Sequence, residues 1–339
     1  MNKKIKVLVV DDSLLFREVL SRGISSDPGI EVVAVASDPY DARDKIIKFE
    51  PDVMTCDIEM PKMNGIEFIK RLLPQYSIPI LVISSLSDTV FDAINAGVID
   101  FVNKPNIQSV KDVEEFIKDV IYKIKTAANA KVIIGRKGAE DKRAEVKIKQ
   151  QSKGIIAIGA STGGTEAIFQ VLKQLPSNIP GIVIVQHIPD RFSRMFAERL
   201  NNALDLKVKE AETGDYLEQG KVLIAPGDQH MRVKKLGGRY KVECFRGERV
   251  NGHCPSVDIL FESVAKEAGS DAVGIILTGM GYDGAKGLLA MKRKGAKTIG
   301  QDEATSVVYG MPKVAYDIGA VEKQVPIGSI AKVLYSLLS

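Results

Sequence analysis

The stretch G-I-I-A-I-G-A-S-T-G-G at residues 154–164 decides how the second half of this chain folds. Its apolar run, Ile155–Ile158, ends in small residues, and a helical pattern begins at Thr165. A short β-branched run bounded by glycine is typical of a buried parallel strand. The sequence therefore predicts a strand-to-helix turn that carries Ser161 at the carboxyl end of a strand, the edge at which open parallel sheets bind and react.

Three interpretations of this turn are open from its local sequence. Gly159, Ser161 and Gly164 imitate the G-x-G-x-x-G pattern of nucleotide-binding loops, but serine replaces the middle glycine and blocks the close backbone approach. Alternatively, Ser161 only caps the following helix. The third interpretation is a nucleophilic serine on a strand-to-helix elbow, which needs a base and an orienting acid from elsewhere in the chain.

Composition bounds the class of protein. The chain has 339 residues, 45% hydrophobic and 27% charged, which is typical of a globular protein with room for two cores. A net charge of +4 is too small to indicate nucleic-acid binding by itself. No apolar run approaches the roughly 20 residues of a membrane span, and three cysteines without metal-binding spacing are typical of reduced thiols. We expect a cytoplasmic protein that does not insert into membranes.

Strand and helix patterns alternate through the first 124 residues. Five β-branched runs predict strands at residues 6–10, 31–36, 53–56, 78–83 and 99–102. Helical patterns begin at Leu14, at Tyr40 and at about Ser109, the last one continuing to about Lys123. Alternating β and α units predict a doubly wound parallel sheet, which brings the strand ends together along one edge.

The residues at these strand ends form an acidic cluster with one lysine. They are Asp11, Asp12, Asp57, Ser84 and Lys104. Carboxylates at close range raise each other's pKa unless a cation lies among them, and a hard cation such as Mg²⁺ takes oxygen ligands. Lys104 supplies a positive charge for a phosphoryl oxygen, and Ser84 a hydroxyl near the same group. The alternative is that each aspartate only caps a following helix.

This half resembles the receiver domains of two-component response regulators. The resemblance is carried by Asp11-Asp12, Asp57 within D-I-E-M-P-K-M-N-G, Ser84, and Lys104-Pro105. It implies a flavodoxin-like domain with a five-stranded parallel sheet over residues 1–124, phosphorylated on Asp57 by a histidine kinase. Its further implied positions are the Mg²⁺ ligands Asp11, Asp12, Asp57 and the backbone carbonyl of Glu59, the phosphate contacts Ser84 and Lys104, and the aromatic switch residue Phe101.

The patterning fades after this half, and we expect a basic linker over residues 125–152. Residues 125–153 contain nine basic and three acidic side chains. One interpretation is a basic arm for nucleic acid or an acidic partner. The other, which we favour, is a solvated tether that permits motion between the halves. Residues 132–134 are a candidate for a short strand.

All three histidines lie in the second half. His187 follows a β-branched run at residues 182–185, so we expect it at a strand end beside Ser161. His230 opens an alternating segment that predicts an edge hairpin turning at residues 236–238. His253 lies in the loop N-G-H-C-P. For His230 and His253 we expect a surface position or a hydrogen-bonded core position.

An acid follows a third buried strand, predicted at residues 272–277. Asp283 lies in T-G-M-G-Y-D-G, before a helix predicted at 285–292, which it would also be placed to cap. Three strand ends thus supply a hydroxyl, an imidazole that takes its proton, and a carboxylate that fixes the imidazole tautomer. The backbone N–H groups of Thr162, Gly163 and Met280 are candidates for an oxyanion hole.

Residues 153–339 resemble the methylesterase domain of the chemotaxis protein-glutamate methylesterases, the CheB type. The motifs are G-A-S-T-G-G at Ser161, Q-H at His187, A-P-G-D-Q-H-M at 225–231, H-C-P-S-V-D at 253–258 and T-G-M-G-Y-D-G at 278–284. The resemblance implies a doubly wound α/β domain with a mainly parallel sheet. It also implies a nucleophile, a general base and an orienting acid, which are Ser161, His187 and Asp283.

The implied reaction is hydrolysis of glutamate γ-methyl esters on methyl-accepting chemoreceptors, which releases methanol, with glutamine deamidation as a second activity. It needs no cofactor beyond the Mg²⁺ of the receiver domain, and the implied partners are the chemoreceptors and a histidine kinase. A DNA-binding output domain is the main rival, but it would need a basic recognition helix in a smaller domain. A nucleotide-binding output domain is the second rival. We expect no nucleic-acid partner.

Overall fold

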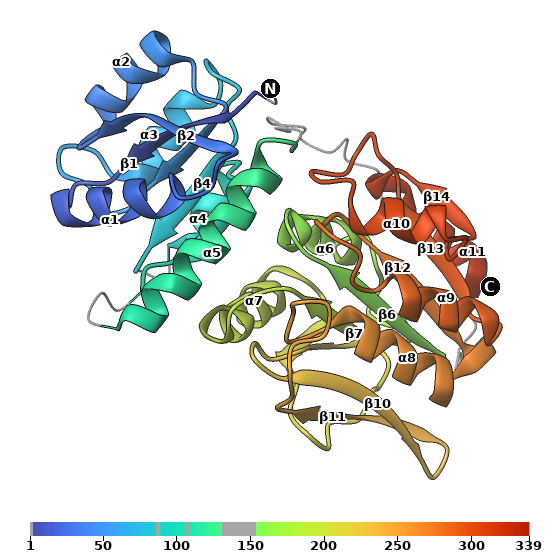
Figure 1. Ribbon diagram of the computed structural model, residues 1–339. Helices are drawn as coiled ribbons and strands as arrows, with labels where there is room; N and C mark the ends of the chain where they lie inside the picture. Colours follow the sequence, from blue (N-terminus) through green and yellow to red (C-terminus); the bar gives the residue numbers. More distant parts are fainter. Residues whose placement is uncertain (1–2, 86–88, 106–108, 131–153, 339) are drawn as a thin grey trace. The chain divides into compact units, whose positions relative to one another are not determined.

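The computed structural model describes residues 3–85, 89–105, 109–130 and 154–338. The chain divides into two α/β units, residues 1–137 and 138–339, and each is described by itself (Figure 1). The strand considered at residues 132–134 lies outside the described residues, as does the predicted linker beyond residue 130. None of the helices in the described ranges combines the length and the hydrophobicity that a bilayer-spanning segment requires.

The first unit is built on five parallel strands in the order β2-β1-β3-β4-β5. The strands are β1 (Ile5–Val10), β2 (Ile30–Ala36), β3 (Val53–Cys56), β4 (Ile80–Ser84) and β5 (Asp100–Asn103). The helices are α1 (Leu14–Ile24), α2 (Pro39–Phe49), α3 (Gly65–Leu72), α4 (Val90–Asn95) and α5 (Val110–Ala127). This is the doubly wound, flavodoxin-like order that the sequence predicted, and its strand order reverses between β1 and β3.

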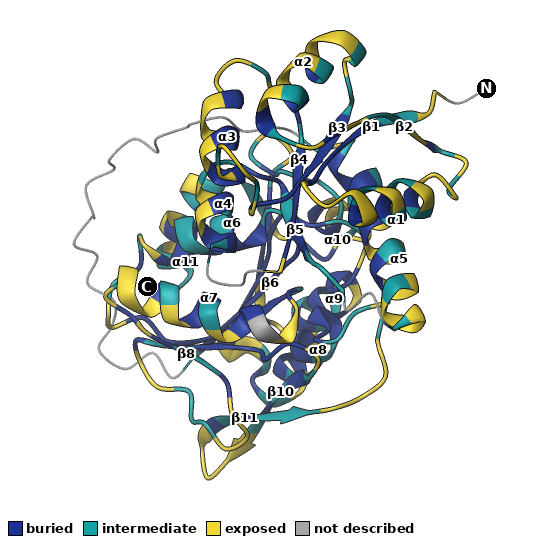
Figure 2. Ribbon diagram, turned by 90° about the vertical axis from the view of Figure 1, so that its left-hand side faces the viewer, coloured by how far each residue is buried: buried dark blue, intermediate teal, exposed yellow. Residues whose placement is uncertain are grey.

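Burial explains why the strands of this unit were easy to predict. Every residue of β3 and β4 is buried, and both strands are mainly apolar, with Thr55 and Ser84 as their polar residues. Figure 2 shows these strands in dark blue. Helix α5 runs further than predicted, to Ala127, because Ile124 and Ala127 are buried and the Thr126 hydroxyl donates a hydrogen bond to the carbonyl of Tyr122. Residues 125–127, assigned to the linker, therefore form the last helical turn.

The second unit has a seven-stranded sheet that is parallel throughout, in the order β14-β13-β12-β6-β7-β9-β8. The strands are β6 (Ile155–Ala160), β7 (Gly181–Gln186), β8 (Lys207–Glu210), β9 (Lys221–Ile224), β12 (Ala272–Ile276), β13 (Lys297–Gln301) and β14 (Lys323–Val325). The helices are α6 (Gly164–Leu172), α7 (Asp190–Ala203), α8 (Val257–Glu267), α9 (Ala285–Arg293), α10 (Met311–Asp317) and α11 (Ile330–Leu338).

The predicted hairpin forms a sheet of its own and is not an edge of the seven-stranded sheet. Strands β10 (His230–Leu236) and β11 (Arg239–Phe245) pair only with each other among the named strands, with their turn at Gly237-Gly238 as expected. The hairpin packs on α8, where the N–H of Val233 donates to the Ser263 hydroxyl at 2.9 Å.

The middle of the seven-stranded sheet positions the candidate site. Strand β6 pairs with β12 on one side and with β7 on the other, and all three run parallel. Their carboxyl ends therefore lie next to one another at one edge. Ser161 follows β6, His187 follows β7, and Asp283 follows β12 after a short glycine-rich turn.

Candidate functional site

Ser161 lies directly after β6, on the turn into α6, and is only 7% exposed. Its backbone N–H donates to the carbonyl of Thr278 at 3.0 Å, which ties the turn to the segment that follows β12. A Cβ at Gly279 would lie 2.7 Å from the Cβ of Ser161 and 3.0 Å from its nitrogen. The close approach of these two turns therefore requires a residue without a side chain.

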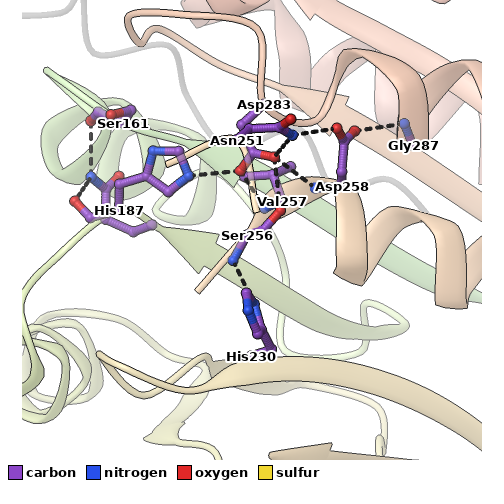
Figure 3. Close-up of polar contacts among 10 residues, drawn as sticks. Ser161, His187, His230, Asn251, Ser256, Val257, Asp258, Asp283 and Gly287 are labelled. Atoms are coloured by element: carbon purple, nitrogen blue, oxygen red, sulfur yellow. Dashed lines mark hydrogen bonds and ion pairs between the residues drawn. The ribbon is translucent and has the colours of Figure 1, made fainter. Parts of the chain in front are cut away.

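His187 is held beside this turn by the residue before it. The Gln186 side-chain amide donates to the carbonyl of Ser161 at 2.9 Å and to that of His187 at 3.1 Å. The N–H of His187 donates to the carbonyl of Ala160 at 3.1 Å. These contacts join the ends of β6 and β7, and Figure 3 shows the His187 ring between Ser161 and Asp283.

His187 and Asp283 are in direct contact. His187 Nε2 lies 2.9 Å from Asp283 Oδ2, and both side chains are largely buried. Because an ionised carboxylate only accepts hydrogen bonds, we assign the ring proton to Nε2, which leaves Nδ1 with its lone pair. Nδ1 is buried without a hydrogen-bond partner in the described structure. It is therefore the nitrogen available to take a proton.

Asp283 accepts hydrogen bonds from four further groups around the N-terminus of α8 (Figure 3), one of them the N–H of Asp258, which lies 3.3 Å from Oδ1. Asn251 Nδ2 and the Ser256 hydroxyl each lie 2.8 Å from Oδ1, and the N–H of Val257 lies 2.7 Å from Oδ2. Burial alone would raise the pKa of this carboxyl, but the hydrogen bonds from His187, Asn251 and Val257 hold the pKa well below its usual range. Asp283 is therefore an anion. It accepts from the N-terminus of α8 rather than capping α9.

The other two histidines differ from each other. His230 is buried, with Nε2 2.8 Å from the carbonyl of Glu248 and Nδ1 accepting from the N–H of Ser256 at 3.2 Å, which is the hydrogen-bonded core position expected. His253 is neither a surface residue nor a simple core residue. Its ring stacks on that of His187, with centroids 3.7 Å apart and an interplanar angle of 11°.

The oxyanion candidates all lie near Ser161 in the chain or in space. Thr162 and Gly163 follow it on the elbow, and Gly163 adopts a φ of 76°, which favours glycine. Met280 follows Gly279, the glycine that passes against Ser161. Their N–H groups remain candidates for the oxyanion hole.

The acidic cluster of the first unit forms as predicted. Oxygen atoms of Asp11, Asp12 and Asp57 lie within 4.8 Å of one another, which fits a hard cation with oxygen ligands such as Mg²⁺. Lys104 Nζ lies 2.6 Å from Asp57 Oδ2 and 2.7 Å from Asp11 Oδ2. Burial raises the pKa of Asp57 against the opposing effect of Lys104.

Two further residues predicted for this unit are Ser84, the last residue of β4, and Phe101, which lies within β5. Ser84 is buried, and its carbonyl accepts from the N–H of Lys104 at 3.1 Å. Phe101 is also buried, with the Lys123 ammonium 5.5 Å from its ring centroid. The metal contact through the carbonyl of Glu59 remains a prediction.

Sequence reasoning missed three residues around His187 and Asp283 in the second unit, which are Asn251, Ser256 and His253. They come from a loop with no strand or helix periodicity. The signal that would have indicated the loop's shape is Asn251-Gly252, a pair typical of tight hairpin turns. Nothing in the sequence showed that this turn would reach Asp283.

Comparison with known proteins divides the chain in the same way. The CheB methylesterase family matches residues 156–334, and the response regulator receiver domain matches residues 7–115. The protein-glutamate methylesterase/protein-glutamine glutaminase 2 of Syntrophomonas wolfei is 58% identical over 338 residues, which cover 99% of this chain and 98% of that protein. A protein-glutamate methylesterase/protein-glutamine glutaminase of Syntrophotalea carbinolica is 48% identical, covering 100% of this chain and 99% of that protein.

A solved structure supports the fold of the second unit. The crystal structure of the Thermotoga maritima CheB methylesterase catalytic domain is 38% identical and covers 54% of this chain and 98% of that one, with a TM-score of 0.53.

Proposed function

Because this chain belongs to the CheB methylesterase family and carries a receiver domain, we propose that it is a phosphorylation-activated protein-glutamate methylesterase. Its proposed substrates are glutamate γ-methyl esters on methyl-accepting chemoreceptors, and its products are methanol and the glutamate carboxylate. Deamidation of receptor glutamines is a proposed second activity of the same site, in chemotactic adaptation. The observation that carries this proposal is the contact of His187 with Asp283 beside the elbow of Ser161.

In the proposed mechanism, His187 Nδ1 takes the proton of the Ser161 hydroxyl while Oγ attacks the ester carbonyl. The backbone N–H groups of Thr162, Gly163 and Met280 are the proposed donors to the oxyanion. The imidazolium then protonates the departing methoxide, which leaves as methanol, and an acyl-serine remains. Water, activated by the same imidazole, releases the glutamate and restores the serine. Asp283 remains an anion throughout and stabilises the imidazolium.

The receiver domain is proposed to control this reaction. Asp57 would accept a phosphoryl group from a histidine kinase. Asp11, Asp12 and Asp57 would hold Mg²⁺, whose positive charge would offset the negative charge that the phosphoryl group adds. Lys104 already contacts Asp57 and would contact the phosphoryl oxygens, with the Ser84 hydroxyl as a second contact. The proposed output is a shift in a two-state arrangement of the surface near Phe101, which relieves inhibition of the esterase.

The purified chain is expected to release methanol from methylated chemoreceptor membranes, and to release it faster when acetyl phosphate and Mg²⁺ are added. Gas chromatography of the released methanol measures the rate. Absence of methanol release would contradict the proposed substrate. Binding to bulk DNA that weakens steeply with salt would favour the DNA-binding alternative, and a rise in melting temperature with ATP or NAD would favour the nucleotide-binding one.

Asp57→Asn is expected to keep the basal esterase rate and to lose the whole response to acetyl phosphate. The amide cannot form an acyl phosphate, whereas residues 161, 187 and 283 are unchanged. The ratio of rates with and without acetyl phosphate measures the effect, and Asp52→Asn, an aspartate on the loop before β3, is the control that keeps the response. An unchanged ratio in Asp57→Asn would mean that another residue is the acceptor.

A further inference from the structure

The turn at residues 250–253 touches both the base and the acid of the proposed triad. Val250 and His253 exchange two backbone hydrogen bonds, of 3.0 and 2.9 Å, and so close a two-residue turn. The central residues, Asn251 and Gly252, have φ values of 54° and 85°. Positive φ at both positions is what a type I′ turn requires, and Asn-Gly is the pair that adopts it most readily.

Two residues of this turn place a side chain in the site, the central Asn251 and the terminal His253. Asn251 Nδ2 donates to Asp283 Oδ1 at 2.8 Å, and the His253 ring lies parallel to the His187 ring at 3.7 Å. The turn is therefore in contact with both partners of the His187–Asp283 hydrogen bond. Ser256, three residues after His253, adds a second hydrogen bond to the same carboxylate.

The turn is also anchored away from the triad. Asn251 Nδ2 donates to Asp258 Oδ2 at 2.7 Å, and Asp258 Oδ1 accepts from the N–H of Gly287 at 2.7 Å (Figure 3). Asp258 lies in the first turn of α8, and Gly287 lies in α9. The turn is thus fastened to two helices that pack on the central sheet, and His253 is carried on a fixed support.

We propose that His253 is a positioning residue for the general base, a proposal that rests on the proposed esterase function. One hydrogen bond, from Nε2 to Asp283, leaves the His187 ring free to tilt about that bond, and Nδ1 must point at Ser161 for proton transfer. A parallel ring against one face removes the tilt, since leaving the stacked arrangement exposes both faces.

This role depends on the aromatic face of residue 253. His253→Ala is expected to lower kcat about 10- to 100-fold, because the acyl-transfer step loses an oriented base. KM is expected to change less than about 3-fold, because receptor binding does not depend on the orientation of that base. His253→Phe is expected to keep kcat within about 5-fold of the wild type. Lys235→Ala is the control, because it removes a side chain that lies over the Tyr240 ring at 5.1 Å in the hairpin. We expect it to leave kcat unchanged.

Two further readouts separate this proposal from loss of the fold and from an incorrect substrate. A fluorophosphonate that labels Ser161 reports activation of the nucleophile without any receptor, so its labelling rate is expected to fall in His253→Ala even if the physiological substrate differs. Proton NMR of the His187 Nε2–H is expected to show a resonance that His253→Phe retains and that broadens in His253→Ala. If the probe labels the wild-type protein but that protein releases no methanol, the proposed substrate would be wrong and this inference would still stand.

Equal kcat and labelling rates in the wild type and His253→Ala would overturn the inference. So would a His253→Phe variant as slow as His253→Ala with its NMR resonance retained, because residue 253 would then act through its ring nitrogens. The full chain is used throughout, and circular dichroism checks that each variant is folded.

Discussion

Ser161→Ala is expected to lower the rate of methyl ester hydrolysis by about 10⁴-fold or more, because no acyl-enzyme can form without the hydroxyl. The change removes one oxygen and leaves the backbone bond from residue 161 to the carbonyl of Thr278 in place. The fold should therefore be retained. Methanol release and the melting temperature of the variant measure the two expectations.

Ser256→Ala is the matched control for this prediction. It also removes a buried hydroxyl at the site, but one that donates to Asp283 and is not placed to attack substrate. We expect it to lower the rate only about 10-fold. Wild-type rates in Ser161→Ala would remove the proposed mechanism, and an equal loss in both variants would mean that the hydroxyl of residue 161 has no special role.

The parts of the molecule that could be predicted are those fixed by short-range patterns. A strand buried on both faces, such as β4 or β6, is a continuous apolar run in the sequence and is recognised without knowledge of its neighbours. The residue that follows such a strand is then placed at a known edge of the sheet. For this reason Ser161, His187 and Asp57 could be located from the sequence, and the parallel topology explains the contact of His187 with Asp283.

The parts that could not be predicted depend on contacts between distant segments. The stacking of His253 on His187 could not be predicted, because the Asn-Gly turn gives only a local shape. The turn is positioned by hydrogen bonds from Asn251 to Asp258 and Asp283. Helix α5 extends to Ala127 because tertiary burial continues past the point where the predicted pattern ended. Packing on α8 likewise separates the β10–β11 hairpin from the main sheet.

Asp283→Asn is expected to lower the esterase rate by about 10⁴-fold, as loss of the orienting acid does in the general Ser-His-Asp template. The amide can present its NH₂ to the ring, which favours the tautomer with the proton on Nδ1 and so blocks the proposed base. It also leaves one acceptor oxygen for the hydrogen bonds of four donors, so we expect a loss of about 1–3 kcal/mol in the free energy of unfolding. Methanol release and urea unfolding measure the two effects.

Asp258→Asn is the control that separates catalysis from stability in this prediction. Asp258 is buried and contacts the same Asn251, but its carboxylate accepts from Asn251 and the N–H of Gly287, whereas Asp283 contacts His187. We expect Asp258→Asn to be destabilised to a similar degree and to keep a rate at least 100-fold above that of Asp283→Asn. Equal rates in the two variants would mean that Asp283 acts only through stability.

The pH dependence of the free energy of unfolding should distinguish the wild type from Asp283→Asn. The pKa of Asp283 is held below its ordinary value of 3.8, so the unfolded chain binds the proton more tightly than the folded one. The carboxylate therefore adds stability that is present above about pH 4 and is lost as the pH falls through the range below 3.8. Between pH 4 and 2 the free energy of unfolding should fall more steeply in the wild type than in Asp283→Asn, because the variant has no carboxylate at residue 283 to titrate. The receiver domain is the same in both proteins and does not contribute to the difference. Parallel curves would contradict the assignment of Asp283 as the anion that these donors hold.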